Sequence, residues 1–179
     1  MGWAAMEGFV YRPEFVGEEE ERALLAEIAR LEFGPVRMRG VVARRRVLHY
    51  GWLYNFASSR ISPGPPLPDV LVPLRGRCAE LAGVRSEDLA EALVTEYPVG
   101  AGIGWHRDAP LFGLIVAVSL AGRCRLRFRR QDQKAEIEAA PRSAYLLSGP
   151  ARTEWEHHIP PTRELRYSIT YRTLRRRTA

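Results

Sequence analysis

The spacing of apolar residues in the first half of the chain predicts two helices. Residues 17–32 open with four glutamates at 18–21, and the helix dipole favours negative charge in a first turn. The apolar residues that follow have the spacing of one helix face: Leu24, Leu25, Ile28 and Leu31. A second helix is predicted over about 69–82, where Gly83 marks its end. Its apolar face consists of Val70, Leu71, Leu74, Cys78 and Leu81.

The segments beside these helices have other patterns. Residues 35–55 are rich in valine, arginine and aromatic residues, and we expect one or two strands with an irregularity at Gly51. Residues 58–69 are dense in proline, glycine and serine and are predicted to form a loop. Residues 86–88 are expected to form a short helical turn.

From Leu93 onward the pattern is that of short strands separated by proline, glycine or polar turns. In RLRFR, Leu126 and Phe128 fall on one face and arginines on the other, as in a half-buried strand. Many short strands in about eighty residues indicate a sandwich or barrel. With two helices before it, the chain is predicted to be an α+β domain whose helices pack on one face of the sheet. The segments are ALVTEY, IGWHRD, LIVAVSL, CRLRFRR, AEIEA, SAYLLS and LRYSITYRTL.

The composition is that of a globular protein. The 179 residues suit one domain, with 46% hydrophobic and 27% charged residues. No apolar run is long enough to span a membrane, and the first residues lack the pattern of a secretion signal. We therefore expect a cytoplasmic protein with no membrane partner, and a monomer. Cys78 and Cys124 have no metal-site spacing and are expected to be reduced, buried thiols.

The positive charge of the chain comes almost entirely from arginine. The formal net charge is +6, and Lys134 is the one lysine among 27 basic residues. Arginine binds phosphate and carboxylate through paired hydrogen bonds and stacks on planar groups. A basic surface of this kind favours a polyanionic partner such as nucleic acid. A genome that prefers arginine codons would produce the same bias, and composition leaves both explanations open.

The segment GWHRDAP, residues 104–110, contains a histidine and an aspartate two positions apart. The tripeptide HRD also occurs in the catalytic loop of protein kinases, where an asparagine follows the aspartate by five residues. Here that position is Gly113, and no glycine-rich loop precedes a VAIK-type lysine. The kinase interpretation is therefore excluded.

A metal site is the alternative for the same segment. Positions i and i+2 of a strand point to one face, so we expect His106 and Asp108 to reach inward together. A non-haem iron site needs a second histidine to complete a facial triad with open positions. The segment EWEHHIPP supplies His157 and His158 about fifty residues later. Without that histidine, a hydrogen-bonded surface pair would be the simpler interpretation.

The segment LRYSITYR adds a separate signal. Strand alternation places four polar residues on one face, namely Arg166, Ser168, Thr170 and Arg172. Unpaired arginines inside a barrel are costly, and a doubly charged ligand between them would compensate their charge. 2-Oxoglutarate is such a ligand, because one end chelates iron and the other carboxylate can accept an arginine fork and a hydroxyl. The opposite face, Tyr167, Ile169 and Tyr171, is expected to pack on the core.

Together these motifs resemble the AlkB family of Fe(II)/2-oxoglutarate dioxygenases. The carriers are TEYPVGAGIGWHRD, ARTEWEHHI and RYSITYR within residues 95–172, and their order and spacing match over nearly the whole chain. The resemblance implies a double-stranded β-helix (jelly-roll) core in a single domain, 1–179. About 1–90 would hold the N-terminal helices and the substrate-recognition region, and about 91–175 the catalytic core. It also implies Fe(II), 2-oxoglutarate and O2.

The resemblance further implies roles for single residues. The iron ligands would be His106, Asp108 and His157, because the family pattern Trp-x-His-x-Ile fits residues 155–159 and so favours His157 over His158. The residues that would contact 2-oxoglutarate are Thr95, Tyr97, Arg166, Ser168 and Arg172. At Thr95, relatives often have an asparagine. Trp52 and Tyr54 lie in the recognition region, where they would either pack in the sheet or stack on a planar base.

The activity implied is oxidation of 2-oxoglutarate to succinate and CO2, coupled to hydroxylation of a C–H bond. An alkylated base in DNA or RNA is the expected substrate, and a hydroxylated N-methyl group would leave as formaldehyde. Repair members often carry an acidic base-reading residue two positions after the iron-binding aspartate, whereas this chain has Pro110. Two alternatives stay open: the same chemistry on a protein side chain or small molecule, and a non-catalytic jelly-roll module that binds nucleic acid.

Overall fold

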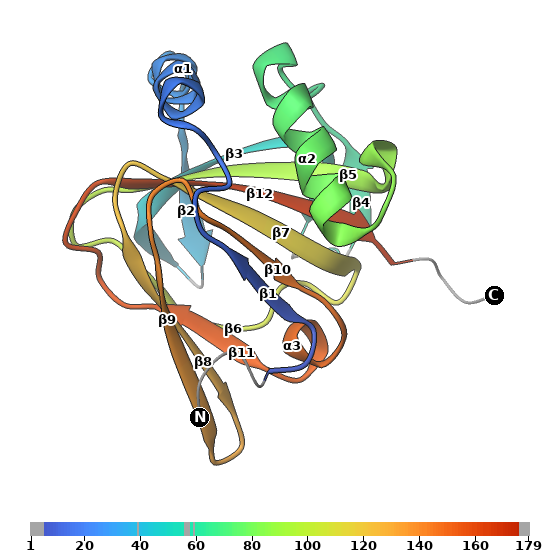
Figure 1. Ribbon diagram of the computed structural model, residues 1–179, viewed down its shortest axis with the longest axis vertical. Coiled ribbons are helices and arrows are strands. Elements are labelled where there is room, and N and C mark those ends of the chain that lie inside the picture. The colour runs from blue at the N-terminus through green and yellow to red at the C-terminus, as the bar shows by residue number, and fades with distance from the viewer. Residues whose placement is uncertain (1–5, 39, 56–57, 59, 176–179) are drawn as a thin grey trace.

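The computed structural model describes residues 6–38, 40–55, 58 and 60–175. Two antiparallel β-sheets face one another, and α1 and α2 cover the outer face of the larger sheet (Figure 1). The larger sheet has eight strands in the order β1-β10-β7-β12-β5-β3-β2, with β4 paired to β3. The smaller sheet has the order β6-β11-β8-β9. This arrangement confirms the predicted double-stranded β-helix.

All the strand segments predicted after residue 90 are present, together with others. The larger sheet consists of β1 (Phe9–Arg12), β2 (Gly34–Met38), β3 (Val41–Asn55), β4 (Arg60–Pro63), β5 (Leu89–Tyr97), β7 (Phe112–Leu120), β10 (Ala144–Leu147) and β12 (Arg166–Leu174). The smaller sheet consists of β6 (Ile103–His106), β8 (Cys124–Arg130), β9 (Gln133–Ala139) and β11 (Glu156–Ile159). The helices are α1 (Glu18–Ile28), α2 (Val72–Ala82) and α3 (Gly149–Thr153), with short 3-10 turns η2 (Asp69–Leu71) and η3 (Ser86–Asp88).

Both predicted helices form and bury the faces that their periodicity predicts. Leu24 and Ile28 of α1, and Leu74 and Cys78 of α2, pack in the core on the outer face of the larger sheet. Gly83 ends α2 in the left-handed conformation, with φ 67°, which glycine adopts without strain. In the described part of the chain, no helix is long and apolar enough to cross a membrane.

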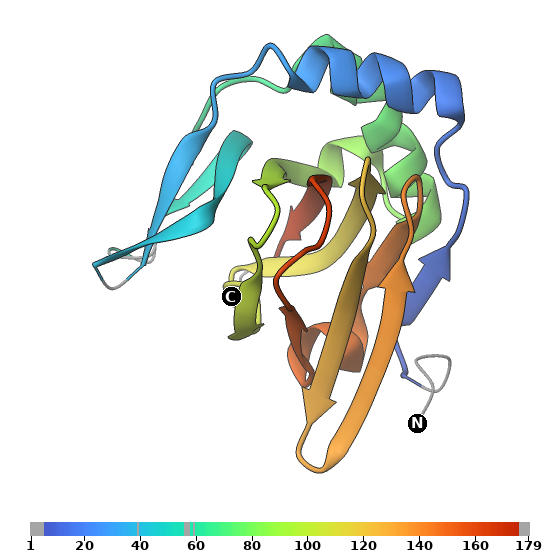
Figure 2. The same ribbon diagram turned by 90° about the vertical axis from the view of Figure 1, so that its left-hand side faces the viewer.

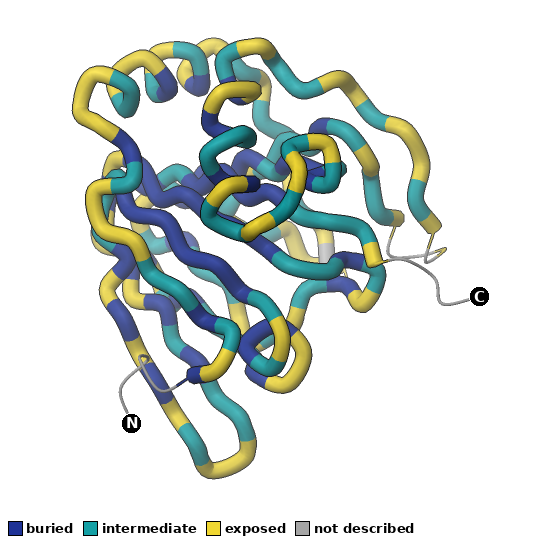
Figure 3. Tube along the Cα trace, turned by 45° about the vertical axis from the view of Figure 1, so that its right-hand side comes forward, coloured by how far each residue is buried: buried dark blue, intermediate teal, exposed yellow. Residues whose placement is uncertain are grey.

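The larger sheet lies between two apolar cores, and this fixes which side chains face the site. Its outer face contributes Val116, Val118, Ile169 and Tyr171 to the core under the helices. On its inner face, Ile115 and Ala117 of β7 share a second core with Leu126 and Phe128 of β8 in the smaller sheet. In Figure 3 the buried residues, in dark blue, run along the strands of the sheets. Strand β12 thus has one face in each layer, as predicted, and its polar face lies between the sheets.

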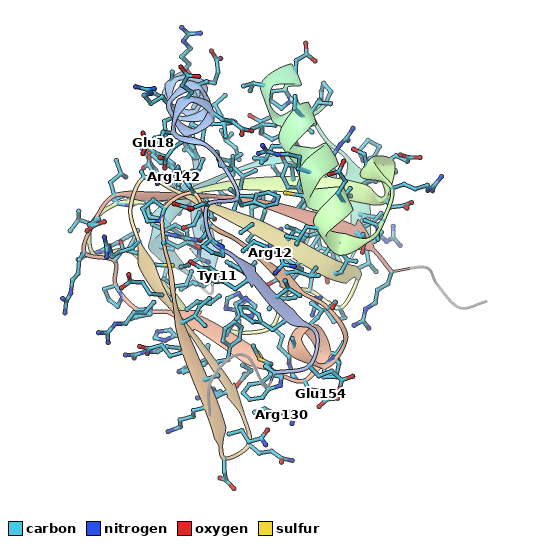
Figure 4. All side chains as sticks on the ribbon, viewed as in Figure 1. Tyr11, Arg12, Glu18, Arg130, Arg142 and Glu154 are labelled. Carbon is cyan, nitrogen blue, oxygen red and sulfur yellow. The ribbon has the colours of Figure 1, made fainter. Side chains whose placement is uncertain are left out.

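Ion pairs attach α1 and α3 to the sheets (Figure 4). Arg142, before β10, lies 3.5 Å from Glu21 and 4.0 Å from Glu18 of α1. Arg130, at the end of β8, lies 2.6 Å from Glu154 beside α3. These pairs are partly exposed, so each contributes at most about 1 kcal/mol. They orient the helices rather than stabilise the fold strongly.

Strand β3 changes partner at Gly51, the residue where the sequence predicts an irregularity. It pairs with β5 from Arg46 to Gly51 and with β4 from Trp52 to Asn55. Gly51 has φ +77°, and a Cβ atom there would lie 2.2 Å from the carbonyl oxygen of Ala90. Only glycine fits this bend. Strands β2 and β3 together form an arm that projects from the body of the molecule (Figure 2).

The sequence interpretation was wrong in one segment and incomplete in others. The expected loop over 58–69 contains β4, which pairs with β3 beyond the bend and has its proline at the strand end, where no ladder hydrogen bond is lost. Strand β1 and helix α3 were not predicted, because four or five residues are too few to display a period. Four of the eight strands in the larger sheet precede residue 90, so the N-terminal region builds the sheet as well as the helices that cover it.

Candidate active site

Three side chains converge between the sheets. The Nε2 atoms of His106 and His157 lie 3.5 and 3.4 Å from Asp108 Oδ1, and the two imidazole centroids are 4.2 Å apart. One ligand atom from each residue falls within 4.8 Å of the others. Two imidazoles and one carboxylate on one side of a centre form the donor set of a non-haem Fe(II) site, with the remaining positions open. The residues present therefore fit the metal.

His106 and Asp108 do not lie on one strand, contrary to the prediction from the sequence. Strand β6 ends at His106, and Asp108 lies in the following loop rather than two positions along the strand. Register still brings the histidines together, because His106 pairs directly with His157 of β11. His106 Nδ1 lies 2.8 Å from the carbonyl oxygen of Gly104. Since a carbonyl only accepts, Nδ1 carries the hydrogen, and Nε2 offers its lone pair to the metal.

Arg152 of α3 holds the loop that carries Asp108 through hydrogen bonds to its backbone. One guanidinium nitrogen donates to the carbonyl oxygens of Asp108, Ala109 and Phe112 at 3.2, 2.8 and 2.9 Å. Arg152 is 5% exposed, so these bonds are shielded from water. Arg152 lies within the segment ARTEWEHHI, but the sequence pattern predicted no role for it. Its role arises from tertiary contact alone.

Asp108 is charged and oriented by its neighbours. Burial alone would raise the pKa of its carboxyl, but Arg172 and the two histidines outweigh this and hold the pKa well below its usual range. Burial lowers the pKa of His157, which favours the neutral ring that binds metal. Arg172 Nε donates to Asp108 Oδ2 at 2.7 Å. The other carboxylate oxygen, Oδ1, is left facing the histidines.

The two arginines of β12 have different surroundings, which revises the idea that both are unpaired. Arg172 is held by Asp108 and also by Glu91, whose Oε2 lies 2.8 Å from its Nη1. Arg166 is 0% exposed and donates from Nε to Ser119 Oγ at 2.8 Å. Its Nη1 and Nη2 atoms are buried with no hydrogen-bond partner in the described structure. Arg166 is thus the arginine of β12 whose buried nitrogens are left for a ligand, and the contact of Arg172 with 2-oxoglutarate stays a prediction.

The free nitrogens of Arg166 fit the distal carboxylate of 2-oxoglutarate. A guanidinium fork binds a carboxylate through two parallel hydrogen bonds, and a buried donor without a partner is costly. The other residues expected to contact this ligand are adjacent. Tyr97 pairs in register with Arg166, and Thr95 with Ser168, so all four side chains lie on the inner face of β5 and β12. The Arg166 guanidinium lies 5.0 Å from the Tyr97 ring centroid.

The remaining predicted residues lie farther from the centre. Trp52 is 38% exposed on β3. Tyr54 packs on Phe112, with ring centroids 6.0 Å apart, and Phe112 in turn lies under Arg172. His158 points away from the metal ligands and stacks on Trp105 at 4.9 Å. Sequence analysis missed Glu91 and Ser119; the signal available for Glu91 was a lone carboxylate in the apolar strand LAEALV.

Comparisons with known proteins agree with this geometry. The family model for the 2OG-Fe(II) oxygenase superfamily matches residues 8–175. An Arabidopsis thaliana protein, "Alkylated DNA repair protein ALKBH8 homolog", is 31% identical over 182 residues, covering 86% of this chain and 51% of that protein. A Danio rerio protein, "Probable RNA/DNA demethylase ALKBH6", is 29% identical over 141 residues, covering 77% of this chain and 58% of that protein. The chain thus spans about half the length of the Arabidopsis relative.

Solved structures share the fold at low identity. OsALKBH1 superimposes with a TM-score of 0.74 and 14% identity, covering 93% of this chain and 96% of that one. A Pseudomonas putida prolyl-4-hydroxylase superimposes with a TM-score of 0.68 and 17% identity, covering 96% of this chain and 95% of that one.

A jelly roll with a His-Asp-His centre between its sheets defines the class as an Fe(II)- and 2-oxoglutarate-dependent oxygenase. The chain belongs to the 2OG-Fe(II) oxygenase superfamily, and the relatives named above are AlkB homologues of that class. It is therefore an enzyme that uses Fe(II), 2-oxoglutarate and O2, and the interpretation as a non-catalytic binding module is dropped.

The geometry makes a prediction about the metal ligands. Substitution of His106, Asp108 or His157 by alanine removes one of three donors and should abolish metal binding and 2-oxoglutarate turnover. His158→Ala should leave both intact, because that ring lies on the other side of the strand. Anaerobic titration with Fe(II) or Co(II) measures the affinity. A His157→Ala protein that still binds metal, beside a His158→Ala protein that does not, would reverse the ligand choice.

The unpartnered nitrogens of Arg166 make a second prediction. Arg166→Met should weaken 2-oxoglutarate binding by roughly 2–5 kcal/mol, or about thirty- to several-thousand-fold. Arg166→Lys should also weaken it, because a point charge does not reproduce two parallel hydrogen bonds. Metal affinity should change little. Ligand-free Arg166→Met protein should resist denaturant at least as well as wild type, since an uncompensated buried charge has gone. Unchanged 2-oxoglutarate affinity in Arg166→Met would refute this assignment.

Proposed function

We propose that the enzyme oxidatively demethylates alkylated nucleobases in DNA or RNA. Two relatives whose names refer to alkylated DNA repair and RNA/DNA demethylation support this substrate class. Bound Fe(II) would supply the activation of O2, with 2-oxoglutarate as the reductant. The overall reaction consumes O2 and 2-oxoglutarate and yields succinate, CO2, formaldehyde and the base with hydrogen in place of methyl. The protein's own task is to hold the base beside His106, Asp108 and His157.

Unpaired positive charge beside the metal loop carries this proposal. Arg107 and Arg175 are exposed, and neither has an ion-pair partner within the described residues. Arg107 follows a metal ligand directly, and the backbone nitrogen of Arg175 bonds to the carbonyl of Leu111 at 2.8 Å. Both cations therefore lie at the edge of the loop after β6. Arg107 donates one long hydrogen bond to the carbonyl oxygen of Thr153 at 3.4 Å and has no carboxylate partner in the described structure. Exposed guanidinium groups there are suited to phosphates of a strand whose base enters the site.

The arginines on the outer face of β8 already have carboxylate partners. On the outer face of β8, Arg125 and Arg127 lie 3.7 and 2.6 Å from Glu136, and Arg129 lies 2.7 Å from Glu156. These cross-strand pairs compensate part of the charge in the row of arginines that the sequence pattern places on that face, with Glu136 shared between Arg125 and Arg127.

Aromatic side chains on β3 add a surface for a planar base. Trp52 is the more exposed of the two predicted residues, and Tyr54 is linked through Phe112 to Arg172 beside the metal ligands. Stacking of a base on an aromatic ring does not depend on its sequence. Pro110 is exposed at the position where repair members often carry an acidic residue. That residue favours the second candidate, the same chemistry on a protein side chain or small molecule.

The test is incubation with Fe(II), 2-oxoglutarate and a panel of methylated DNA and RNA oligonucleotides. The expected result is loss of a methyl group by mass spectrometry, matched by formaldehyde and succinate, with His157→Ala as the inactive control. Binding should weaken linearly on a plot of log K against log salt. Arg175→Gln should reduce that slope by about one, whereas Arg129→Gln, whose charge Glu156 already compensates, should leave it unchanged. Succinate formation with no oligonucleotide demethylated would refute the proposal and favour the second candidate.

Trp52 allows a narrower prediction. Trp52→Ala should raise KM for a methylated oligonucleotide by about five- to 150-fold, the range for losing one base–aromatic stack of about 1–3 kcal/mol. Turnover of 2-oxoglutarate without oligonucleotide should stay near the wild-type rate, because Trp52 contacts none of the predicted iron or 2-oxoglutarate ligands. If the variant loses both activities and its cooperative unfolding, Trp52 is a packing residue instead.

A further inference from the structure

A line of polar and charged side chains connects β3 to a predicted metal ligand. His49 Nδ1 lies 3.1 Å from Glu91 Oε1, and Arg172 Nη1 donates to Glu91 Oε2 at 2.8 Å. Arg172 Nε then donates to Asp108 Oδ2 at 2.7 Å. The four residues come from β3, β5, β12 and the loop after β6. Each oxygen of Glu91 thus has its own partner, one on each neighbouring strand.

Glu91 is buried more deeply than any other carboxylate in these pairs. Its side chain is 1% exposed, compared with 8% for Asp108 and 11% for Arg172. A glutamate is almost never buried to this degree unless it is paired. Glu91 is not grouped with His106, Asp108 and His157 at the metal site. Its burial therefore needs an explanation other than direct ligation.

The explanation lies in the charge on Arg172. This guanidinium bridges two carboxylates, one of which also has to serve the metal. If Asp108 alone balanced Arg172, the pair would be neutral and would offer a divalent cation little net charge. With Glu91 present, Asp108, Arg172 and Glu91 together carry a net charge of −1, so Arg172 does not cancel the charge that Asp108 offers to the metal. Opposite charge nearby favours a bound cation in proportion to its proximity and burial.

We propose that Glu91 is a positioning residue of the iron centre: it holds and neutralises Arg172, so that Asp108 keeps both its orientation and its negative charge for the metal. Arg172 fixes Asp108 through Oδ2, which leaves Oδ1 facing the Nε2 atoms of His106 and His157. Glu91 fixes Arg172 in turn. The role does not depend on which substrate the enzyme oxidises.

The chain offers a matched control in Glu96. It lies on the same strand, is 8% exposed, and forms an ion pair with Arg46 of β3 at 2.7 Å. Glu96 faces the other side of β5, where it also accepts a hydrogen bond from Tyr167. Glu91 and Glu96 thus both join β5 to β3 through a buried carboxylate. Only Glu91 is connected to the metal ligands.

The experiment compares Glu91→Gln with Glu96→Gln by anaerobic titration with Co(II) alone, read by its visible absorption. Glu91→Gln should weaken Co(II) binding about tenfold, at the lower end for residues that orient metal ligands, and should change the absorption bands. Glu96→Gln should bind Co(II) like wild type. Thermal unfolding of both variants measures any general loss of stability. Equal Co(II) affinity in Glu91→Gln and wild type would overturn the proposal, as would an equal loss in both variants.

A double-mutant comparison tests whether Glu91 acts through Arg172. In protein that already carries Arg172→Met, adding Glu91→Gln should have no further effect on Co(II) affinity, because the charge that Glu91 neutralises is gone. A further tenfold loss in the double variant would mean that Glu91 acts on the metal by another route, and would overturn the proposal. This comparison also decides the matter if Glu91→Gln alone does not fold, because the double variant lacks the uncompensated arginine.

Discussion

Charge placed between two apolar sheets has to be compensated, and this constraint organises the interior of the enzyme. The space between the sheets holds four charged side chains with little exposure to solvent, namely Asp108, Glu91, Arg166 and Arg172. Asp108, Glu91 and Arg172 are tolerated there because they compensate one another, whereas Arg166 has a hydroxyl partner alone within the described residues. The metal ligands are thus part of a charge network that the sheet itself determines. Arg152 extends the same principle to the backbone by bonding three carbonyl groups of the metal loop.

Strand β12 divides this network into a permanent part and a part completed by ligand. Arg172 has both of its carboxylate partners within the protein, so that end of the site is preorganised before any ligand binds. Arg166 has a hydroxyl partner at Nε and two nitrogens without one. Six residues along one strand therefore separate a structural cation from a binding cation. Preorganisation at one end and unmet hydrogen bonding at the other suit a cosubstrate that bridges metal and arginine.

Local pattern was sufficient to predict much of this fold, and non-local pairing accounts for the errors. Alternation along β12 and β8 assigned the inner and outer faces correctly, because one face of each strand is apolar. Strand β4 was taken for a loop, since its proline-rich sequence becomes a strand only beside the far half of β3. Convergence of His106 and Asp108 was expected for the wrong reason, as a loop held by Arg152 replaces the strand. The partners of Arg172, Asp108 and Glu91, come from distant segments, and a periodic pattern along one segment does not predict such contacts.

The bend at Gly51 separates two kinds of evolutionary freedom. Before it, β3 is committed to the sheet and contributes His49 to the pair with Glu91, so changes there disturb the metal centre. Beyond it, the described residues of β3 and β4 belong to neither apolar core. Apart from Tyr54, which packs on Phe112, changes in these residues leave the interior packing intact. Under the proposed function, this exposed ribbon could be exchanged to alter the substrate while the metal ligands beneath it stay the same.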